Sequence, residues 1–192
     1  MASLKNKLKL GIIIAVIIVF GALLVYCIAC PIKLRCSCIE YFQLDSFEWN
    51  LFSDECQQLQ ANEQSGDNQV FGELPDVQST TAGEYTRVWY YVDLSSHKLG
   101  SLTECSLMFT DVDNSAHRFV YSPSPAFNET VPAFGRQRLS RSVYVNRSGL
   151  TDEELKGLLQ NVGLSVYYQQ NGKLMVQEVS ASGSIVQLAS LN

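Results

Sequence analysis

The chain has 192 residues and a formal net charge of −5. This length accommodates one ordinary domain together with an additional segment. An acidic chain repels the phosphate backbone, so the composition argues against nucleic acid as the main partner. The charges are also unevenly distributed, because residues 36–86 contain ten acidic residues and no lysine or arginine.

The N-terminal part contains the longest apolar segment of the chain. Residues 10–32 carry no charged side chain and consist mainly of Ile, Val, Leu, Ala and Phe. About 20 helical residues span the ~30 Å hydrocarbon core of a bilayer, and a soluble helix is seldom apolar on every face. The sequence therefore predicts a transmembrane signal-anchor helix over residues 10–30, preceded by a basic tail over residues 1–9. A cleaved signal peptide and a lipid-modified Cys30 are the alternatives.

The flanking charges predict the direction of this helix. Lys5, Lys7 and Lys9 precede it, whereas Lys33 and Arg35 follow it and are soon succeeded by acidic residues. The positive-inside rule then places the N-terminus in the cytoplasm. We therefore expect a single-pass protein of the cell membrane, with the lipid bilayer as one partner and an extracytoplasmic C-terminal domain.

Residues 31–84 are predicted to form an acidic neck that contains cysteines. Within it, residues 45–60 show apolar side chains at helical spacing, and Asp45 is suited to cap a helix start. Phe47, Trp49 and Leu51 also alternate as in a strand. The polar residues that follow favour a short helix over residues 45–60.

Residues 85–192 show the pattern of a β-rich domain. Alternating segments predict strands over residues 86–94, 105–109, 117–121, 137–146 and 185–189, with the second and third forming a hairpin. Thr151 and Glu154 form a capping box at the start of a short helix. Asn171-Gly172 lies between two further strands, residues 164–170 and 173–179, and predicts a tight hairpin.

These elements predict a transmembrane helix plus a mainly-β domain, an antiparallel β-sandwich with one short helix. An α+β fold is the alternative, because a helix precedes the last hairpin. The sequence shows no alternation of strands and helices that would indicate a parallel sheet, and no motif identifies a family.

The six cysteines suggest disulfides or lipid attachment. Cys56 and Cys105 are the candidates for a disulfide within the domain, and the bridge would join the neck to the β domain. Cys30, Cys36 and Cys38 lie near the membrane exit, where they are candidates for disulfides, including bridges between two chains, or for lipidation.

The sequence predicts no catalytic, cofactor-binding or metal-binding residue. Ser95 and Lys98 have the spacing of a lysine-activated serine, but the companion motifs of such enzymes are absent. Cys105 and His117 on neighbouring strands are an equally weak candidate for a nucleophile and its base. Ordinary loop and core positions explain these residues as well.

Four arginines form the one basic cluster of the C-terminal part and suggest a patch for an anionic partner. On a strand over residues 137–145, the third arginine would share a face with Leu139 and Val143, whereas the first two would share the other face. Ordinary surface positions are the competing interpretation. The four are Arg136, Arg138, Arg141 and Arg147.

Together these patterns predict a single-pass membrane protein that presents a non-catalytic extracytoplasmic β domain for binding, with a protein partner and homo-oligomerisation as expectations. One alternative is a cell-envelope hydrolase or transpeptidase-like enzyme that uses Ser95 or Cys105. The other is a structural subunit of a membrane assembly that associates through its anchor and the cysteines beside it.

Overall fold

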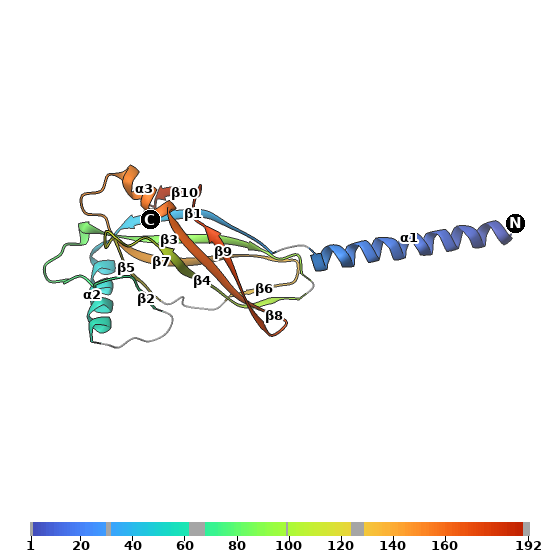
Figure 1. Cartoon of the computed structure of the whole chain (residues 1–192), viewed down its shortest axis with the longest axis horizontal. Helices are drawn as coiled ribbons and strands as arrows, with labels where there is room; N and C mark the ends of the chain where they lie inside the picture. The colour runs from blue at the N-terminus through green and yellow to red at the C-terminus, as the bar shows by residue number, and fades with distance from the viewer. Residues whose placement is uncertain (1, 30–31, 62–67, 99, 124–128, 190–192) are drawn as a thin grey trace.

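The chain forms a long N-terminal helix followed by a β-sandwich (Figure 1). The computed structural model describes residues 2–29, 32–61, 68–98, 100–123 and 129–189, and along the N-terminal helix it describes the side chains of residues 11–25. The helices are α1 (Ala2–Ala29), α2 (Ser46–Gln60), the short 3₁₀ helix η1 (Ala82–Glu84) and α3 (Asp152–Gln160). The strands are β1 (Lys33–Gln43), β2 (Gln69–Val70), β3 (Tyr85–Ser95), β4 (Leu102–Val112), β5 (Phe119–Ser122), β6 (Glu129–Val131), β7 (Arg136–Asn146), β8 (Val162–Gln170), β9 (Lys173–Ser180) and β10 (Ile185–Leu188).

The strands form two sheets. The larger sheet has the order β10-β1-β3-β7-β5-β2, and the smaller has the order β6-β4-β8-β9. Among the described strands, neighbours are antiparallel with one exception: β10 runs parallel to β1. The fold is thus mainly β, as predicted, and its two sheets make a sandwich.

One apolar core lies between the two sheets. Strand alternation sends every second side chain inward, so Val88, Tyr90, Val92 and Leu94 of β3 are fully buried. The opposite sheet contributes residues such as Leu107 of β4, in the same cluster. The core also receives two leucines of α3, so this helix closes one side of the sandwich; they are Leu155 and Leu159.

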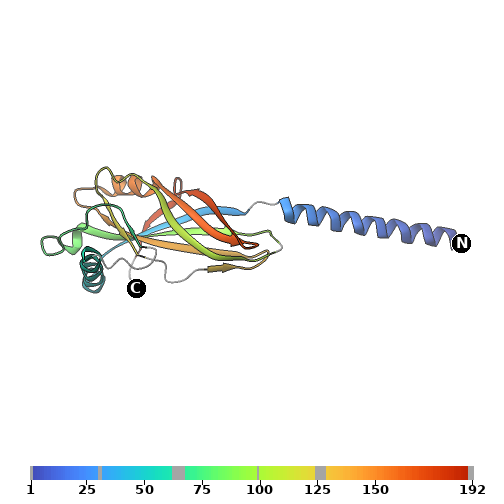
Figure 2. The same ribbon diagram turned by 60° about the horizontal axis from the view of Figure 1, so that its bottom comes forward.

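A second apolar cluster lies outside the large sheet, beneath α2. Phe52 and Cys56 of α2 are fully buried there against Tyr85 and Tyr144 of the sheet. The aspartate side chain at position 45 accepts a hydrogen bond of 2.8 Å from the amide of Glu48 and caps the helix, as its sequence position indicates. The helices α2 and α3 lie on opposite sides of the sandwich, at the end remote from α1 (Figures 1 and 2).

Local signals placed several of these elements correctly. The helix α3 begins with the expected capping box, in which Thr151 and Glu154 exchange hydrogen bonds. The β8–β9 hairpin turns at Asn171 and Gly172, whose φ angles are 52° and 72°. Both residues therefore have the positive φ that a two-residue turn of this kind requires.

Two expectations about the sandwich need correction. Strands β4 and β5 follow each other along the chain but lie in different sheets, so the predicted hairpin between residues 105–109 and 117–121 is not formed. The segment assigned to a neck contains β1, an eleven-residue strand that pairs with β3 and β10. Residues 33–43 therefore belong to the sandwich itself, because Ile39 and Tyr41 supply apolar surface to its core.

The helix α1 extends away from one end of the sandwich (Figure 1). The described side chains of this helix, which include Ile12, Ile17 and Phe20, are exposed. Within the residues whose side chains the structure describes, which along α1 are residues 11–25, no helix is long and apolar enough to cross a membrane.

Candidate functional site

An open groove of 1180 Å³ lies at the end of the sandwich that directly follows α1. Its walls come from the start of β1, the end of β3, the start of β7 and the edge strand β9. Four of the lining residues are basic and one is acidic. The lining residues are Ile32, Lys33, Leu34, Arg35, Asp93, Ser95, Arg136, Gln137, Arg138 and Gln177.

The strand register brings the four basic residues of the groove together. Residues that lie directly opposite each other in antiparallel strands project from the same face of the sheet. Two adjacent rows therefore cross β1, β3 and β7 on the outer face, whereas Leu94 between them points into the core. One row contains Lys33, Ser95 and Arg136, and the other contains Arg35, Asp93 and Arg138.

One ion pair lies within the second row. The Arg138 Nε donates a hydrogen bond to Asp93 Oδ1 at 2.9 Å, and both side chains remain substantially exposed. This hydrogen bond is the main reason that the pKa of Asp93 lies below its ordinary value, and the charge of Arg35 adds to the effect. The Arg138 guanidinium also lies 5.9 Å from the ring centre of Tyr91. The negative charge of Asp93 is therefore already balanced by Arg138 on the neighbouring strand.

The other three basic residues leave a surplus of positive charge in the groove. Lys33, Arg35 and Arg136 are exposed, and none of them forms an ion pair with another described residue. Guanidinium and ammonium groups spaced across a sheet can donate several charge-assisted hydrogen bonds to one anionic group. The groove is thus suited to a phosphate or carboxylate.

A tight turn between β6 and β7 holds Arg136 in position. The Gly135 amide donates to the Pro132 carbonyl, and the Gly135 carbonyl accepts from the Ser96 amide, both at 2.9 Å. A Cβ atom on Gly135 would lie only 2.8 Å from the Pro132 carbonyl oxygen. Glycine, which has no Cβ atom, is therefore required at position 135 for the close approach to Pro132. The turn places the start of β7 beside the end of β3.

The residues of the groove are the basis for its chemistry. No protein-family model and no curated protein matches this chain. The charges of the groove, its exposure and its place in the fold therefore indicate what it can bind.

The structure distributes the four predicted arginines over three places. Arg136 and Arg138 line the groove, on the outer face of the sheet. Arg141 is 1% exposed and points into the core, where its Nε donates a hydrogen bond of 2.8 Å to Ser122 Oγ. Arg147 lies at the opposite end of the sandwich and pairs with Asp152. The four arginines therefore do not form a single patch.

Lys33 and Arg35 are absent from the basic patch that the sequence predicts. Both were assigned to a membrane flank and a neck, although the strand β1 begins at Lys33. The alternation of Lys33 and Arg35 with Leu34 and Cys36 is the signal that could have revealed a strand here. No pattern in the neighbouring sequence indicates that these two residues lie beside β3 and β7.

The described cysteines are thiols and not disulfides. Cys36, Cys56 and Cys105 are buried and free, and Cys38 is partly exposed and free. The expected bridge between Cys56 and Cys105 is not formed, because the first lies beneath α2 and the second lies between the sheets. Cys30 lies outside the described residues. Within the described residues, no cluster of side chains is suited to hold a metal ion.

The two candidate catalytic pairs are not assembled. Cys105 lies near the start of β4, and its pKa is raised by burial, which disfavours the reactive thiolate. His117 follows the far end of β4, so the two residues lie at opposite ends of one long strand. The Ser95 side chain lines the groove, and the structure shows no hydrogen bond between it and Lys98 within the described residues.

Thiol labelling of the native full chain in detergent tests this arrangement. We expect an alkylating reagent to modify Cys38 at least roughly tenfold faster than Cys36, Cys56 and Cys105, because access of the reagent controls the rate. Peptide mass spectrometry identifies each modified position. In denaturant all four should react at similar rates. A peptide pair joined through Cys56 and Cys105 in a non-reducing digest would contradict the structure.

Proposed function

We propose that the protein is a single-pass membrane protein that presents its β-sandwich for binding, without catalysis, and that the basic groove is its binding site. The groove carries this proposal, because three exposed cationic side chains of the groove form no ion pair with another described residue. The separation of Cys105 from His117 supports binding over catalysis. Binding requires only complementary charge and shape, which the groove supplies.

The apolar segment supports the membrane part of the proposal. Residues 10–32 carry no charge, and at about 1.5 Å per residue the part of this segment that lies in α1, residues 10–29, is about 30 Å long, which matches the hydrocarbon core. The exposed apolar side chains along α1 would find a favourable environment among lipid tails. These residues are Ile12, Ile13, Ile14, Val16, Ile17, Ile18, Val19, Phe20, Leu23, Leu24 and Val25.

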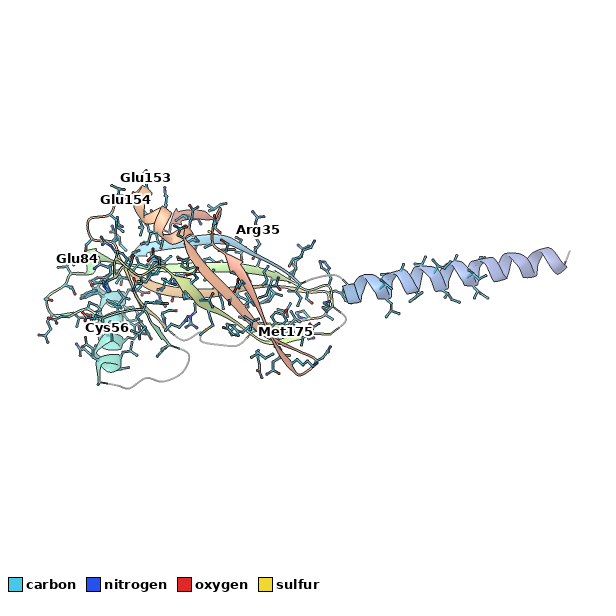
Figure 3. All side chains as sticks on the ribbon, in the orientation of Figure 1. Arg35, Cys56, Glu84, Glu153, Glu154 and Met175 are labelled. Atoms are coloured by element: carbon cyan, nitrogen blue, oxygen red, sulfur yellow. The ribbon has the colours of Figure 1, made fainter. Side chains whose placement is uncertain are left out.

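The charge distribution supports a direction for the protein in the membrane. Three lysines precede the apolar segment, whereas Lys33 and Arg35 are the two basic residues that follow it before Arg87. The positive-inside rule counts Lys and Arg near the membrane and therefore favours a cytoplasmic N-terminus. The sandwich would then lie on the extracytoplasmic side. Glu84, Glu153 and Glu154 lie at the end remote from α1 (Figure 3), where a protein partner in the surrounding medium would meet them first.

Charges placed in the middle of α1 test the anchor. We expect the double variant Ile17→Asp and Phe20→Asp to lose its resistance to alkaline carbonate extraction, because each aspartate costs about 2.5 to 3.5 kcal/mol at a helix centre in a bilayer. Membrane fractionation followed by immunoblotting measures the effect.

The matched control for this experiment is Ile17→Leu with Phe20→Leu, which should remain in the membrane fraction. Release of the wild-type chain by carbonate would overturn the membrane proposal. Protease added outside intact cells tests the direction, because an extracytoplasmic sandwich is accessible to it. Protection of the sandwich in intact cells would place it on the other side.

A further inference from the structure

We propose that the basic groove docks on anionic phospholipid headgroups of the membrane that holds α1, so that the groove end of the sandwich lies against the bilayer. This inference rests on the proposed function, because it requires α1 to cross the membrane. It specifies the ligand of the groove as the headgroup phosphates and acidic lipids of that membrane.

The connection between α1 and the groove is short. Ile32 lines the groove and follows Ala29, the last residue of α1, by three peptide steps. Three steps extend over at most about 11 Å. The headgroup layer on one side of a bilayer is about 5 to 8 Å thick. The groove of an anchored chain would therefore lie within or just above the headgroups, where their local concentration is very high.

The groove end of the sandwich carries a surplus of positive charge. The two rows of the groove present four basic side chains and one aspartate that already pairs with Arg138. Lys98 follows the end of β3 and Lys173 starts β9, so both lie at the same end. Glu104, near the start of β4, and Glu129 of β6 also lie there, and the basic residues still outnumber the acidic ones. Each basic side chain near an anionic membrane contributes on the order of fivefold to the docking equilibrium.

Acidic residues gather at the far end of the sandwich. Arg35 lies toward the α1 side, whereas Glu84, Glu153 and Glu154 lie at the remote end (Figure 3). The helix α2, also at the remote end, adds further acidic residues such as Asp54. An anionic surface attracts one end of such a molecule and repels the other, so its field favours one orientation of the sandwich.

An exposed apolar segment lies next to the groove. Leu174, Met175 and Val176 lie on the edge strand β9 and are 64%, 41% and 53% exposed. The next residue of this strand, Gln177, lines the groove and donates a hydrogen bond of 3.4 Å to the Ile32 carbonyl. Phe134, in the turn before β7, is 54% exposed as well. Basic residues beside exposed apolar ones are the combination that binds membrane interfaces.

Hydrogen exchange of the full chain in nanodiscs tests the inference. One set of discs contains phosphatidylcholine alone, and the other contains about one third phosphatidylglycerol. We expect amide exchange in residues 33–38 and 173–177 to be slower in the anionic discs, and this difference to disappear in high salt, because salt screens the attraction. Exchange in α3, at the remote end, should be the same in both.

Removal of positive charge at each end of the sandwich sharpens the test. Lys33→Gln with Arg136→Gln should weaken docking roughly 25-fold and abolish the difference between the two discs. Lys156→Gln, which removes an exposed positive charge from α3, should leave the difference intact. Unchanged exchange in the core strands β4 and β8 verifies that each variant is folded.

The outcomes separate the inference from the proposed function. If the chain fails to float with lipid vesicles, the anchor fails and docking fails with it. If the chain floats but exchange at the groove is equal in both discs, the headgroup inference alone is overturned. Slower exchange on addition of inorganic phosphate, with no effect of lipid composition, would assign the groove to a soluble anion and would also overturn it.

Discussion

Replacement of Phe52 by alanine is expected to lower the free energy of unfolding by about 3 to 5 kcal/mol. The Phe52 side chain is fully buried between α2 and the large sheet. Its ring centre lies 4.5 Å from that of Tyr144 and 5.3 Å from that of Tyr85. Truncation removes these contacts and leaves a cavity under α2. Urea unfolding of the full chain in detergent, followed by tryptophan fluorescence, measures the change.

Phe47 provides a matched control on the same helix. It lies in the first turn of α2 and is 73% exposed, so Phe47→Ala should change the free energy of unfolding by less than about 0.5 kcal/mol. Docking of the groove should be unaffected by either change, because α2 lies at the other end of the sandwich. Equal losses for Phe52→Ala and Phe47→Ala would mean that α2 does not pack as described.

Stability is expected to fall in alkaline solution because a thiol is buried beneath α2. Burial, with a smaller effect from the charge of Glu55, raises the pKa of Cys56 from its ordinary 9.0 to about 12. The folded state therefore favours the neutral thiol, whereas the unfolded chain ionises it. The resulting stabilisation is fully present below pH 9 and is lost as the pH rises from 9 towards 12. The loss should be on the order of 2 kcal/mol at about pH 11.

Tyr121, which lies beside this thiol, also makes the stability fall in alkaline solution, at slightly higher pH. The reason is that burial raises the pKa of Tyr121 to about 12. Cys56→Ala should be less stable than wild type at neutral pH, because of the cavity, but should lose less stability between pH 9 and pH 10. Phe47→Ala is the control and should keep the wild-type slope, because it changes an exposed side chain of α2 and removes no ionisable group. Urea unfolding at each pH measures the slopes. Parallel curves for wild type and Cys56→Ala would exclude this thiol as the cause.

Much of the secondary structure could be predicted because its signals are local. The cap at Asp45, the capping box at Thr151 and the Asn171-Gly172 turn each act over a few residues. Alternation of apolar side chains likewise identified β3 and β7. Such patterns identify an element and its buried face, and they identify a mainly-β domain.

The partners of each strand could not be predicted in this way. The strand β1 pairs with β3, some 50 residues later in the chain, and with β10, near the C-terminus. The strands β4 and β5 follow each other in sequence but pair in different sheets. Pairing between distant strands depends on how all faces bury their apolar surface together, and no short pattern records it.

The candidate site likewise has features that the sequence determines and features that only the tertiary structure determines. Taken alone, the sequence determined the apolar character of residues 10–32, the excess of acidic residues over 36–86 and the alternation that separates Arg141 from Arg136 and Arg138. Only the tertiary structure decided that Lys33 and Arg35 join Arg136 and Arg138 in one groove, and that Arg147 lies at the opposite end. The reason is physical: composition and periodicity are properties of neighbouring residues, whereas a charged surface is made by the register of strands that the core brings together.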